Sequence, residues 1–183
     1  ALAKLPPELV DKEFHPGQQS KSLRFKMATV LYIDIIGFKE IAASQDSREY
    51  IDQLDQIYYE FDKITDKHNI LKIRSLGDSY MCAGGVPIKN ITNPIDVVLA
   101  ALEMKAYVEK LKVEVDHADG LFWEFKFGIH TGPVTANVRG KKKISYDLTG
   151  EPVTIATRMA ASAESSEIIA SDMTYVMVQG YFV

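Results

Sequence analysis

The first half of the chain alternates between short apolar runs and longer segments whose apolar residues recur at helical spacing. The run MATVLYIDII, residues 27–36, is dominated by β-branched and other apolar residues and carries one charge, Asp34. Such a run is typical of a central strand. We expect this strand to end near Ile35, because Gly37 interrupts the pattern.

Two more apolar runs follow close together. Residues 70–76 (ILKIRSL) and 79–86 (SYMCAGGV) predict two strands joined by a short turn at Gly77 and Asp78. A hairpin of this kind exposes its tip, so the Asp78 carboxylate is expected at the surface.

Two longer segments show the helical period. Apolar side chains form one stripe between residues 48 and 68, and a second stripe follows Asn93 and Pro94. Proline suits the first turn of a helix, so the second helix is expected to begin there. The first stripe, expected in a core or a dimer seam, comprises Ile51, Leu54, Ile57, Tyr58, Phe61 and Ile64.

The remainder of the chain predicts shorter elements. Residues 121–130 and 134–138 predict two strands that flank Thr131-Gly132-Pro133 as a second hairpin. The other predicted elements are a strand over 144–148, a helix from Glu151 through Met159, a strand over 167–171 and a helix over 172–178.

The order strand, helix, strand, strand, helix, strand is that of the split βαβ, ferredoxin-like arrangement. The sequence therefore predicts an α+β fold, a ferredoxin-like βαββαβ palm with an added small C-terminal subdomain. We expect residues 27–183 to form this domain. Residues 1–26 contain three prolines and many polar side chains, and are expected to be an irregular lead-in or linker.

Composition narrows the functional classes. The 183 residues carry a formal charge of −4 at pH 7, which argues against a surface for nucleic acid or anionic lipid. The single cysteine, Cys82, permits no intramolecular disulfide and favours a reducing compartment. No apolar run approaches the roughly 20 residues that span a bilayer, so a soluble, cytoplasmic chain is expected.

Two carboxylates are the candidate chemistry. In the ferredoxin-like order the first strand lies beside the hairpin, which brings Asp34 next to Asp78. Two carboxylates so close repel each other unless a cation lies between them, and Mg²⁺ prefers oxygen ligands of this kind. The structural alternative is that Asp34 caps a helix and Asp78 is an ordinary turn residue. A lone charge in an apolar strand, beside a second at the neighbouring tip, favours the metal site.

Four segments resemble motifs of the class III nucleotidyl cyclases, which make cyclic AMP or cyclic GMP. They are LYIDIIGFKEIA and KIRSLGDSYMCAGGVP, similar to the two metal motifs; FGIHTGPVTANV, similar to the second hairpin; and SYDLTGEPVTIATRMAASAE, similar to the base-reading and catalytic-helix motif. The match runs in order from about Met27 to the C-terminus. It implies a palm related to that of polymerases and a head-to-tail homodimer with active sites at the interface.

The resemblance also implies a role for each matched residue. Asp34 and Asp78 match the aspartates that hold two Mg²⁺ or Mn²⁺ ions per active site. Asp147 matches the aspartate that reads the adenine amino group, and Arg158 matches the arginine that stabilises the transition state. The implied reaction is in-line attack of the ribose 3′-oxygen of ATP on the α-phosphorus, with pyrophosphate leaving.

Three features depart from the family pattern. Arg74 stands where adenylate cyclases have lysine and guanylate cyclases have glutamate; a cationic donor with an aspartate acceptor suits adenine, so ATP is favoured. Thr154 replaces the catalytic asparagine and shares one helix face with Arg158. The chain ends before the strands that carry a phosphate-binding lysine, which predicts a C-terminal truncation with Lys142 as the substitute.

These departures leave two alternatives open. One is a cyclase-homology domain that binds nucleotide or dimerises with little or no turnover, because the missing asparagine positions the ribose. The other is a guanylate cyclase. A diguanylate-type cyclase is disfavoured, because no segment resembles the acidic Gly-Gly loop of that family. The resemblance further implies a sensor or membrane portion upstream, with this domain in the cytoplasm.

Overall fold

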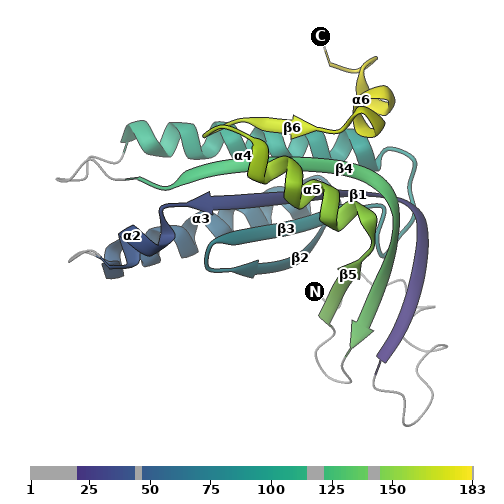
Figure 1. The fold of residues 1–183 in the computed structure, drawn as a ribbon, viewed down its shortest axis with the longest axis horizontal. Coiled ribbons are helices and arrows are strands. Elements are labelled where there is room, and N and C mark those ends of the chain that lie inside the picture. Colours follow the sequence, from purple (N-terminus) through teal and green to yellow (C-terminus); the bar gives the residue numbers. More distant parts are fainter. Residues whose placement is uncertain (1–19, 44–46, 115–121, 140–144, 183) are drawn as a thin grey trace.

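The computed structural model describes residues 20–43, 47–114, 122–139 and 145–182. Figure 1 shows a twisted sheet with helices on both faces. The elements are β1 (Ser20–Ile36), α2 (Phe38–Ala42), α3 (Ser47–Lys67), β2 (Leu71–Leu76), β3 (Ser79–Gly84), α4 (Asn93–Glu114), β4 (Glu124–Arg139), β5 (Ser145–Thr149), α5 (Glu151–Ser162), β6 (Ile168–Ala170) and α6 (Asp172–Val178). Within these ranges, no helix combines the length and apolar character that crossing a membrane requires.

The sheet has the strand order β2-β3-β1-β4-β5, and β6 pairs in parallel with β4. β1 is antiparallel to both β3 and β4. The first four strands, with α3 and α4 between them in the chain, therefore have the ferredoxin-like order, and the predicted fold class is confirmed. β5, α5, β6 and α6 form the added part.

Alternate residues of β1 face two separate cores. Leu31, Ile33 and Ile35 are buried with the apolar stripes of α3 and α4 in the larger core, as predicted for those stripes. Val30 faces the other side, where it joins Ala156 of α5 in a second core. Because side chains alternate along a strand, Asp34 lies on the α5 side of the sheet.

Gly128 allows α5 to lie directly on β4. A Cβ atom at this position would collide with backbone atoms of Ala156 and Ala160. Glycine is the only residue without a Cβ, so it permits this close approach of helix and strand.

The predicted hairpin at Thr131-Gly132-Pro133 is wrong. β4 runs unbroken through these residues and pairs with β1 on both sides of them. Pro133 has no partner in the ladder, because β1 carries a bulge between Phe25 and Ala28, so its missing N–H costs no sheet hydrogen bond. β4 bends here instead of turning back, and its second half pairs with β5 (Figure 1).

The predicted start of the domain is also corrected. Residues 20–26 were expected in the irregular lead-in, but β1 already begins at Ser20. The segment SKSLRF, residues 20–25, is a weak strand signal on its own, and it is extended because it pairs with residues 134–139 of β4. The rest of the predicted lead-in lies outside the described residues.

Candidate active site

Strand pairing brings the two predicted metal-binding aspartates together. Asp34 pairs with Ser79 in the β1–β3 ladder, and the amide of Ile35 donates to the carbonyl oxygen of Asp78 at 2.8 Å. Asp34 lies inside a strand, and the residue that caps α2 is Gly37, so the alternative of a helix-capping aspartate is wrong. Asp78 is exposed at the hairpin tip, as expected.

Two opposing influences act on the Asp34 carboxyl. Burial is the largest cause that raises its pKa, and the charge of Asp78 raises the pKa further. Lys126, its cross-strand neighbour on β4, acts in the opposite direction. An ionised pair is therefore unfavourable unless additional positive charge is supplied at the site.

The donor set fits a hard divalent cation. Mg²⁺ is usually held by one or two carboxylates and completes its shell with water and substrate phosphate. Among the residues that the structure describes, no group of three or more His, Cys, Asp or Glu side chains is placed to hold a metal ion. A set of two carboxylates suits Mg²⁺ or Mn²⁺ better than Zn²⁺, which takes three or four protein ligands.

The hairpin tip that carries Asp78 is held from two helices. The Tyr58 hydroxyl on α3 lies 2.6 Å from the carbonyl oxygen of Gly77, to which it donates, and 3.3 Å from that of Ser79. Gly77 has a φ of +45°, and a Cβ there would come within 3.3 Å of the Phe38 ring on α2. The backbone on both sides of Asp78 is thereby fixed.

Sequence reasoning missed Tyr58 and Lys126 as parts of this region. Tyr58 belongs to the apolar stripe of the first long helix, and its ring does pack in the core. Its hydroxyl group was the one available signal, because a buried tyrosine usually bonds through its oxygen. Lys126 lies in the alternating segment FKF, where a lysine on a strand is unremarkable.

A second pair of charged residues joins distant strands. Arg74 on β2 and Asp147 on β5 form an ion pair with 3.5 Å between Nη1 and Oδ1. β2 and β5 are the two ends of the strand order, so the sheet curls strongly to bring them together. The two side chains are 41% and 50% exposed, which leaves a guanidinium donor and a carboxylate acceptor open to a ligand.

α5 presents a third group. Pro152, Ala156 and Ala160 are buried, whereas Thr154 and Arg158 are exposed. Their spacing of four residues places both on one helix face, as predicted. Neither side chain forms a hydrogen bond or an ion pair with any residue that the structure describes.

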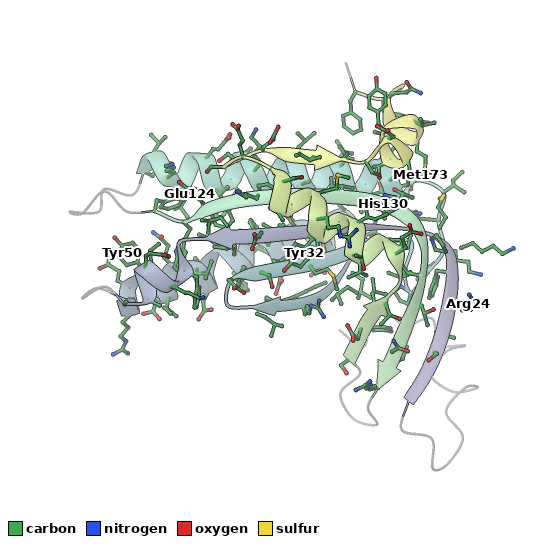
Figure 2. All side chains as sticks on the ribbon, in the orientation of Figure 1. Arg24, Tyr32, Tyr50, Glu124, His130 and Met173 are labelled. Atoms are coloured by element: carbon green, nitrogen blue, oxygen red, sulfur yellow. The ribbon has the colours of Figure 1, made fainter. Side chains whose placement is uncertain are left out.

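Within the described residues, these three groups are not joined to one another by polar contacts. Across the described ranges, no hydrogen bond or ion pair connects the aspartates, the Arg74–Asp147 pair and the exposed face of α5, and neither arginine is among the charges that shift the pKa of Asp34. Figure 2 labels Tyr32, which lies two residues before Asp34 in β1. Because side chains alternate along a strand, Tyr32 marks the sheet face on which Asp34 lies. Lys142, the predicted phosphate-binding residue, lies outside the described residues.

Comparison with known proteins identifies the family. Residues 20–182 match the adenylate and guanylate cyclase catalytic domain. The chain belongs to this family. The predicted resemblance to class III cyclases is thus confirmed for this cyclase domain.

Relatives of this cyclase domain include enzymes named for either nucleotide. It is 33% identical over 182 residues to a membrane guanylyl cyclase of Dictyostelium discoideum, covering 99% of this chain and 12% of that protein. It matches the guanylate cyclase domain of RhGC from Catenaria anguillulae in complex with GTP, with a TM-score of 0.77, 27% identity and coverage of 88% and 86% of the two chains. It also matches the adenylyl cyclase CyaB from P. aeruginosa, with a TM-score of 0.79, 26% identity and coverage of 89% and 85%. The chain therefore spans a small part of its curated relatives.

Proposed function

We propose that this cyclase domain is an adenylate cyclase, which converts ATP to 3′,5′-cyclic AMP and pyrophosphate. The observation that carries the proposal is the Arg74–Asp147 pair. In the orientation that the family resemblance implies, adenine presents an acceptor at N1 to the guanidinium and a donor at its amino group to the carboxylate. Guanine in the same orientation would direct N1–H at Arg74 and O6 at Asp147, so both contacts would become repulsive.

The proposed reaction forms one bond and breaks one. The ribose 3′-oxygen attacks the α-phosphorus in line, the bond from that phosphorus to the β-phosphate oxygen breaks, and pyrophosphate and the 3′-hydroxyl proton are released. Asp34 and Asp78 would hold two Mg²⁺ or Mn²⁺ ions, which supply positive charge at the attacking and leaving oxygens. Cyclases of this class generally use divalent ions of this kind.

The residues of α5 act on the other side of the nucleotide. Arg158 has no described partner, so its planar guanidinium is free to donate two hydrogen bonds to phosphate and to stabilise charge that develops there. Thr154, one turn earlier, can orient the ribose through its hydroxyl, with one donor where an asparagine would have two. This difference predicts slower turnover and an unchanged reaction.

We propose that two copies assemble head to tail and share two active sites. The support is that no hydrogen bond or ion pair joins the three groups within the described residues of one chain, where Lys126 is the one cation that lowers the pKa of Asp34. A second copy can supply Arg158, Thr154 and the Arg74–Asp147 pair to the aspartates of the first. Closed two-fold pairing is also the commonest form of homo-oligomer.

A guanylate cyclase is the second candidate. Curated relatives that match most of this chain are named guanylyl cyclases, and one matching structure contains GTP. Relatives are also named as membrane and receptor-type proteins. We therefore propose that the full-length protein carries an upstream sensor or membrane portion, with this domain on the cytoplasmic side.

One assay tests the reaction and the base. The purified protein is incubated with Mn²⁺ and either ATP or GTP, and cyclic nucleotide and pyrophosphate are measured beside Asp34→Ala and beside Asp52→Ala, a carboxylate removed from an exposed position on α3. We expect cyclic AMP from the wild type and from Asp52→Ala, and about 1,000-fold less from Asp34→Ala.

The other outcomes are equally informative. Preference for GTP would support the second candidate and contradict the role given to the Arg74–Asp147 pair. Saturable nucleotide binding without product from any variant would identify a regulatory cyclase-homology domain, the alternative that Thr154 keeps open. Equal product from Asp34→Ala and the wild type would contradict the metal site itself.

A further inference from the structure

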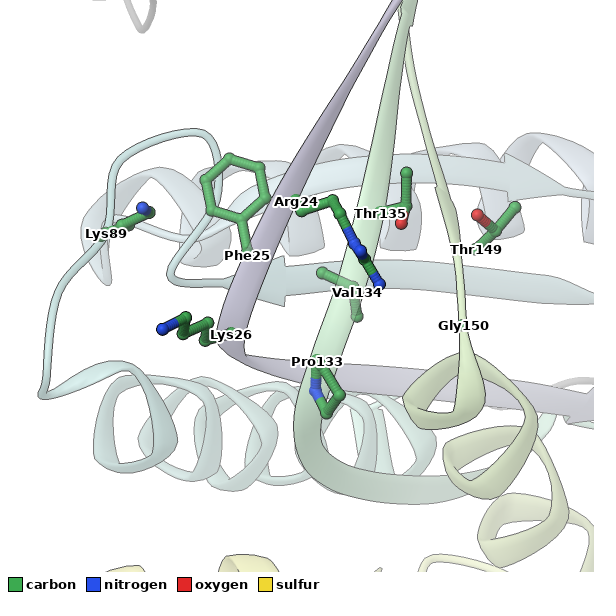
Figure 3. A pocket seen from close by; sticks show the side chains of 9 residues that line it. All are labelled: Arg24, Phe25, Lys26, Lys89, Pro133, Val134, Thr135, Thr149 and Gly150. Atoms are coloured by element: carbon green, nitrogen blue, oxygen red, sulfur yellow. The ribbon is translucent and has the colours of Figure 1, made fainter.

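A pocket of about 530 Å³ lies at the bend of the sheet, next to the strand that carries Asp147. It forms where the bulge of β1 opens the ladder opposite Pro133, and it extends to Gly150, the N-cap of α5. Six described residues are proposed to bind nucleotide or metal ions, and none of them lines this pocket. Figure 3 shows the pocket with its lining side chains.

The charge of this pocket is unusual for the molecule. Its lining contains three cationic side chains, Arg24, Lys26 and Lys89, and no acidic one. The chain as a whole carries a charge of −4, so the pocket is a local exception. None of the three cations forms an ion pair with a residue in the described ranges. No acidic side chain in the described ranges therefore neutralises these three positive charges, and their combined field attracts anions.

Polar donors line up across three strands of the pocket wall. Arg24 pairs with Thr135 in the β1–β4 ladder, and Thr135 pairs with Thr149 in the β4–β5 ladder. Residues paired in this way carry their side chains on the same face, so a guanidinium and two hydroxyls form one row. Figure 3 shows Arg24 lying over β4 beside Thr135, its partner in the ladder. A guanidinium binds carboxylate or phosphate through two parallel hydrogen bonds, and the hydroxyls add further donors.

The rest of the lining is apolar. Phe25, Pro133 and Val134 contribute to the wall, and Phe25 and Val134 are 5% and 3% exposed, so they belong to a packed and preformed surface. Small-molecule sites typically occupy about 300–1,000 Å³ and combine apolar walls with a few placed polar groups. The size and composition of this pocket match that description.

We propose that this pocket binds a small amphipathic anion, a phosphate or carboxylate attached to an apolar or aromatic group. The anionic part would contact Arg24 and the two threonine hydroxyls, with Lys26 and Lys89 adding charge. The apolar part would cover the exposed ring of Pro133. The site is additional to the proposed nucleotide site, and it borders the first turn of α5, the helix that carries Thr154 and Arg158.

Phenyl phosphate is a suitable probe, with inorganic phosphate and phenol as its two halves. Binding of each to the full chain is measured by ligand-observed NMR titration, for the wild type, Arg24→Ala and Arg48→Ala. Arg48 is a matched control, because it is an exposed arginine on α3 that does not line the pocket. We expect phenyl phosphate to bind the wild type and Arg48→Ala alike, and Arg24→Ala about tenfold more weakly. Phenol and inorganic phosphate should each bind more weakly than phenyl phosphate.

Further variants separate this site from the others. Thr149→Val keeps the shape but removes a hydroxyl, and should weaken phenyl phosphate about threefold. Arg74→Ala should leave its affinity unchanged. Equal affinity in Arg24→Ala and the wild type, or no binding of any probe, would overturn the proposal. Competition between phenyl phosphate and ATP, or loss of binding in Arg74→Ala, would place the probe in the nucleotide site and would also overturn it.

Discussion

The two ends of the candidate active site are built differently within one chain. At the acidic end, Asp34 lies in the centre of the sheet, and the tip that carries Asp78 is held by Tyr58 and by the packing of Phe38 on Gly77. At the cationic end, the Arg74–Asp147 contact is long at 3.5 Å, and Arg158 is exposed without a described partner. The acidic end is therefore preorganised by the fold, whereas the cationic end is exposed to solvent.

The acidic end should show the largest effect on removal. Asp34→Ala removes one of two carboxylates that would hold the metal ions, and among the described residues no third His, Cys, Asp or Glu side chain is placed to replace it. We expect cyclic nucleotide production to fall about 1,000-fold. Titration of Mn²⁺ by calorimetry in the presence of a non-hydrolysable ATP analogue should show the same loss of metal binding. Retained Mn²⁺ binding would place the metal elsewhere.

Mixing two inactive variants tests whether the two ends meet across an interface. Asp78→Ala lacks the acidic end and Arg158→Ala lacks the cationic end, so each alone should be inactive. Random pairing makes half of the dimers mixed, and each mixed dimer has one intact site of two, so about one quarter of wild-type activity should return. If the mixture is no more active than the separate variants, the head-to-tail dimer is contradicted. Asp78 and Arg158 would then not act together across an interface.

The preference for ATP over GTP tests the cationic end alone. Asp147→Asn keeps the shape but presents an amide that can either accept or donate, so guanine O6 is no longer repelled. We expect the ratio of kcat/KM for ATP to that for GTP to fall about tenfold. Asp52→Asn on the exposed side of α3 is the control and should leave the ratio unchanged. An unchanged ratio in Asp147→Asn would mean that other residues read the base.

The clamp on the hairpin tip should have a moderate effect. Tyr58→Phe removes the hydrogen bond to Gly77 and leaves the ring in the core, so cyclase activity should fall about three- to tenfold and the Mn²⁺ concentration for half-maximal activity should rise. Tyr80→Phe is a matched control, because it removes a buried hydroxyl that donates to Asp62 at 2.8 Å. Both variants should lose similar stability, and only Tyr58→Phe should change the metal dependence. Identical metal dependence would reduce Tyr58 to a structural role.

The smallest effect concerns stability without metal. Burial and the charge of Asp78 raise the pKa of Asp34 above its ordinary value of 3.8, so its contribution to stability is present below pH 3.8 and is lost as the pH rises through the raised pKa. Asp34→Asn should therefore raise the melting temperature of the metal-free protein at pH 7 by about 1–2 °C, after allowance for solvent screening. The difference should vanish near pH 3. A lower melting temperature at pH 7 would show that Lys126 outweighs the burial and repulsion.

Local patterns explain which parts of the fold were predictable. The strand that carries Asp34 and the stripes of α3 and α4 have strong periodic signals, and the structure confirms them. The hairpin predicted at Thr131-Gly132-Pro133 failed because turn-forming residues are also compatible with a bent strand when the partner strand carries a bulge. That bulge lies about 100 residues earlier in the chain, so no local window contains both features.

The candidate site divides in the same way. The approach of Asp34 to Asp78 follows from the order of elements, because neighbouring strands in a ferredoxin-like sheet must place those positions side by side. The approach of Arg74 to Asp147 depends on the curl of the sheet, and only the family resemblance suggested that they act together. The role of the Tyr58 hydroxyl had no sequence signal beyond the oxygen itself.

The sequence by itself determined the long helices, the main strands, the family and the adjacency of Asp34 and Asp78, because periodicity and motifs are properties of neighbouring residues. Tertiary structure alone decided the bend of β4, the clamp on the hairpin tip, the Arg74–Asp147 contact and the cationic pocket beside the bulge. Each of these joins segments far apart in the chain, and their meeting is set by sheet curvature and packing, which no local pattern encodes.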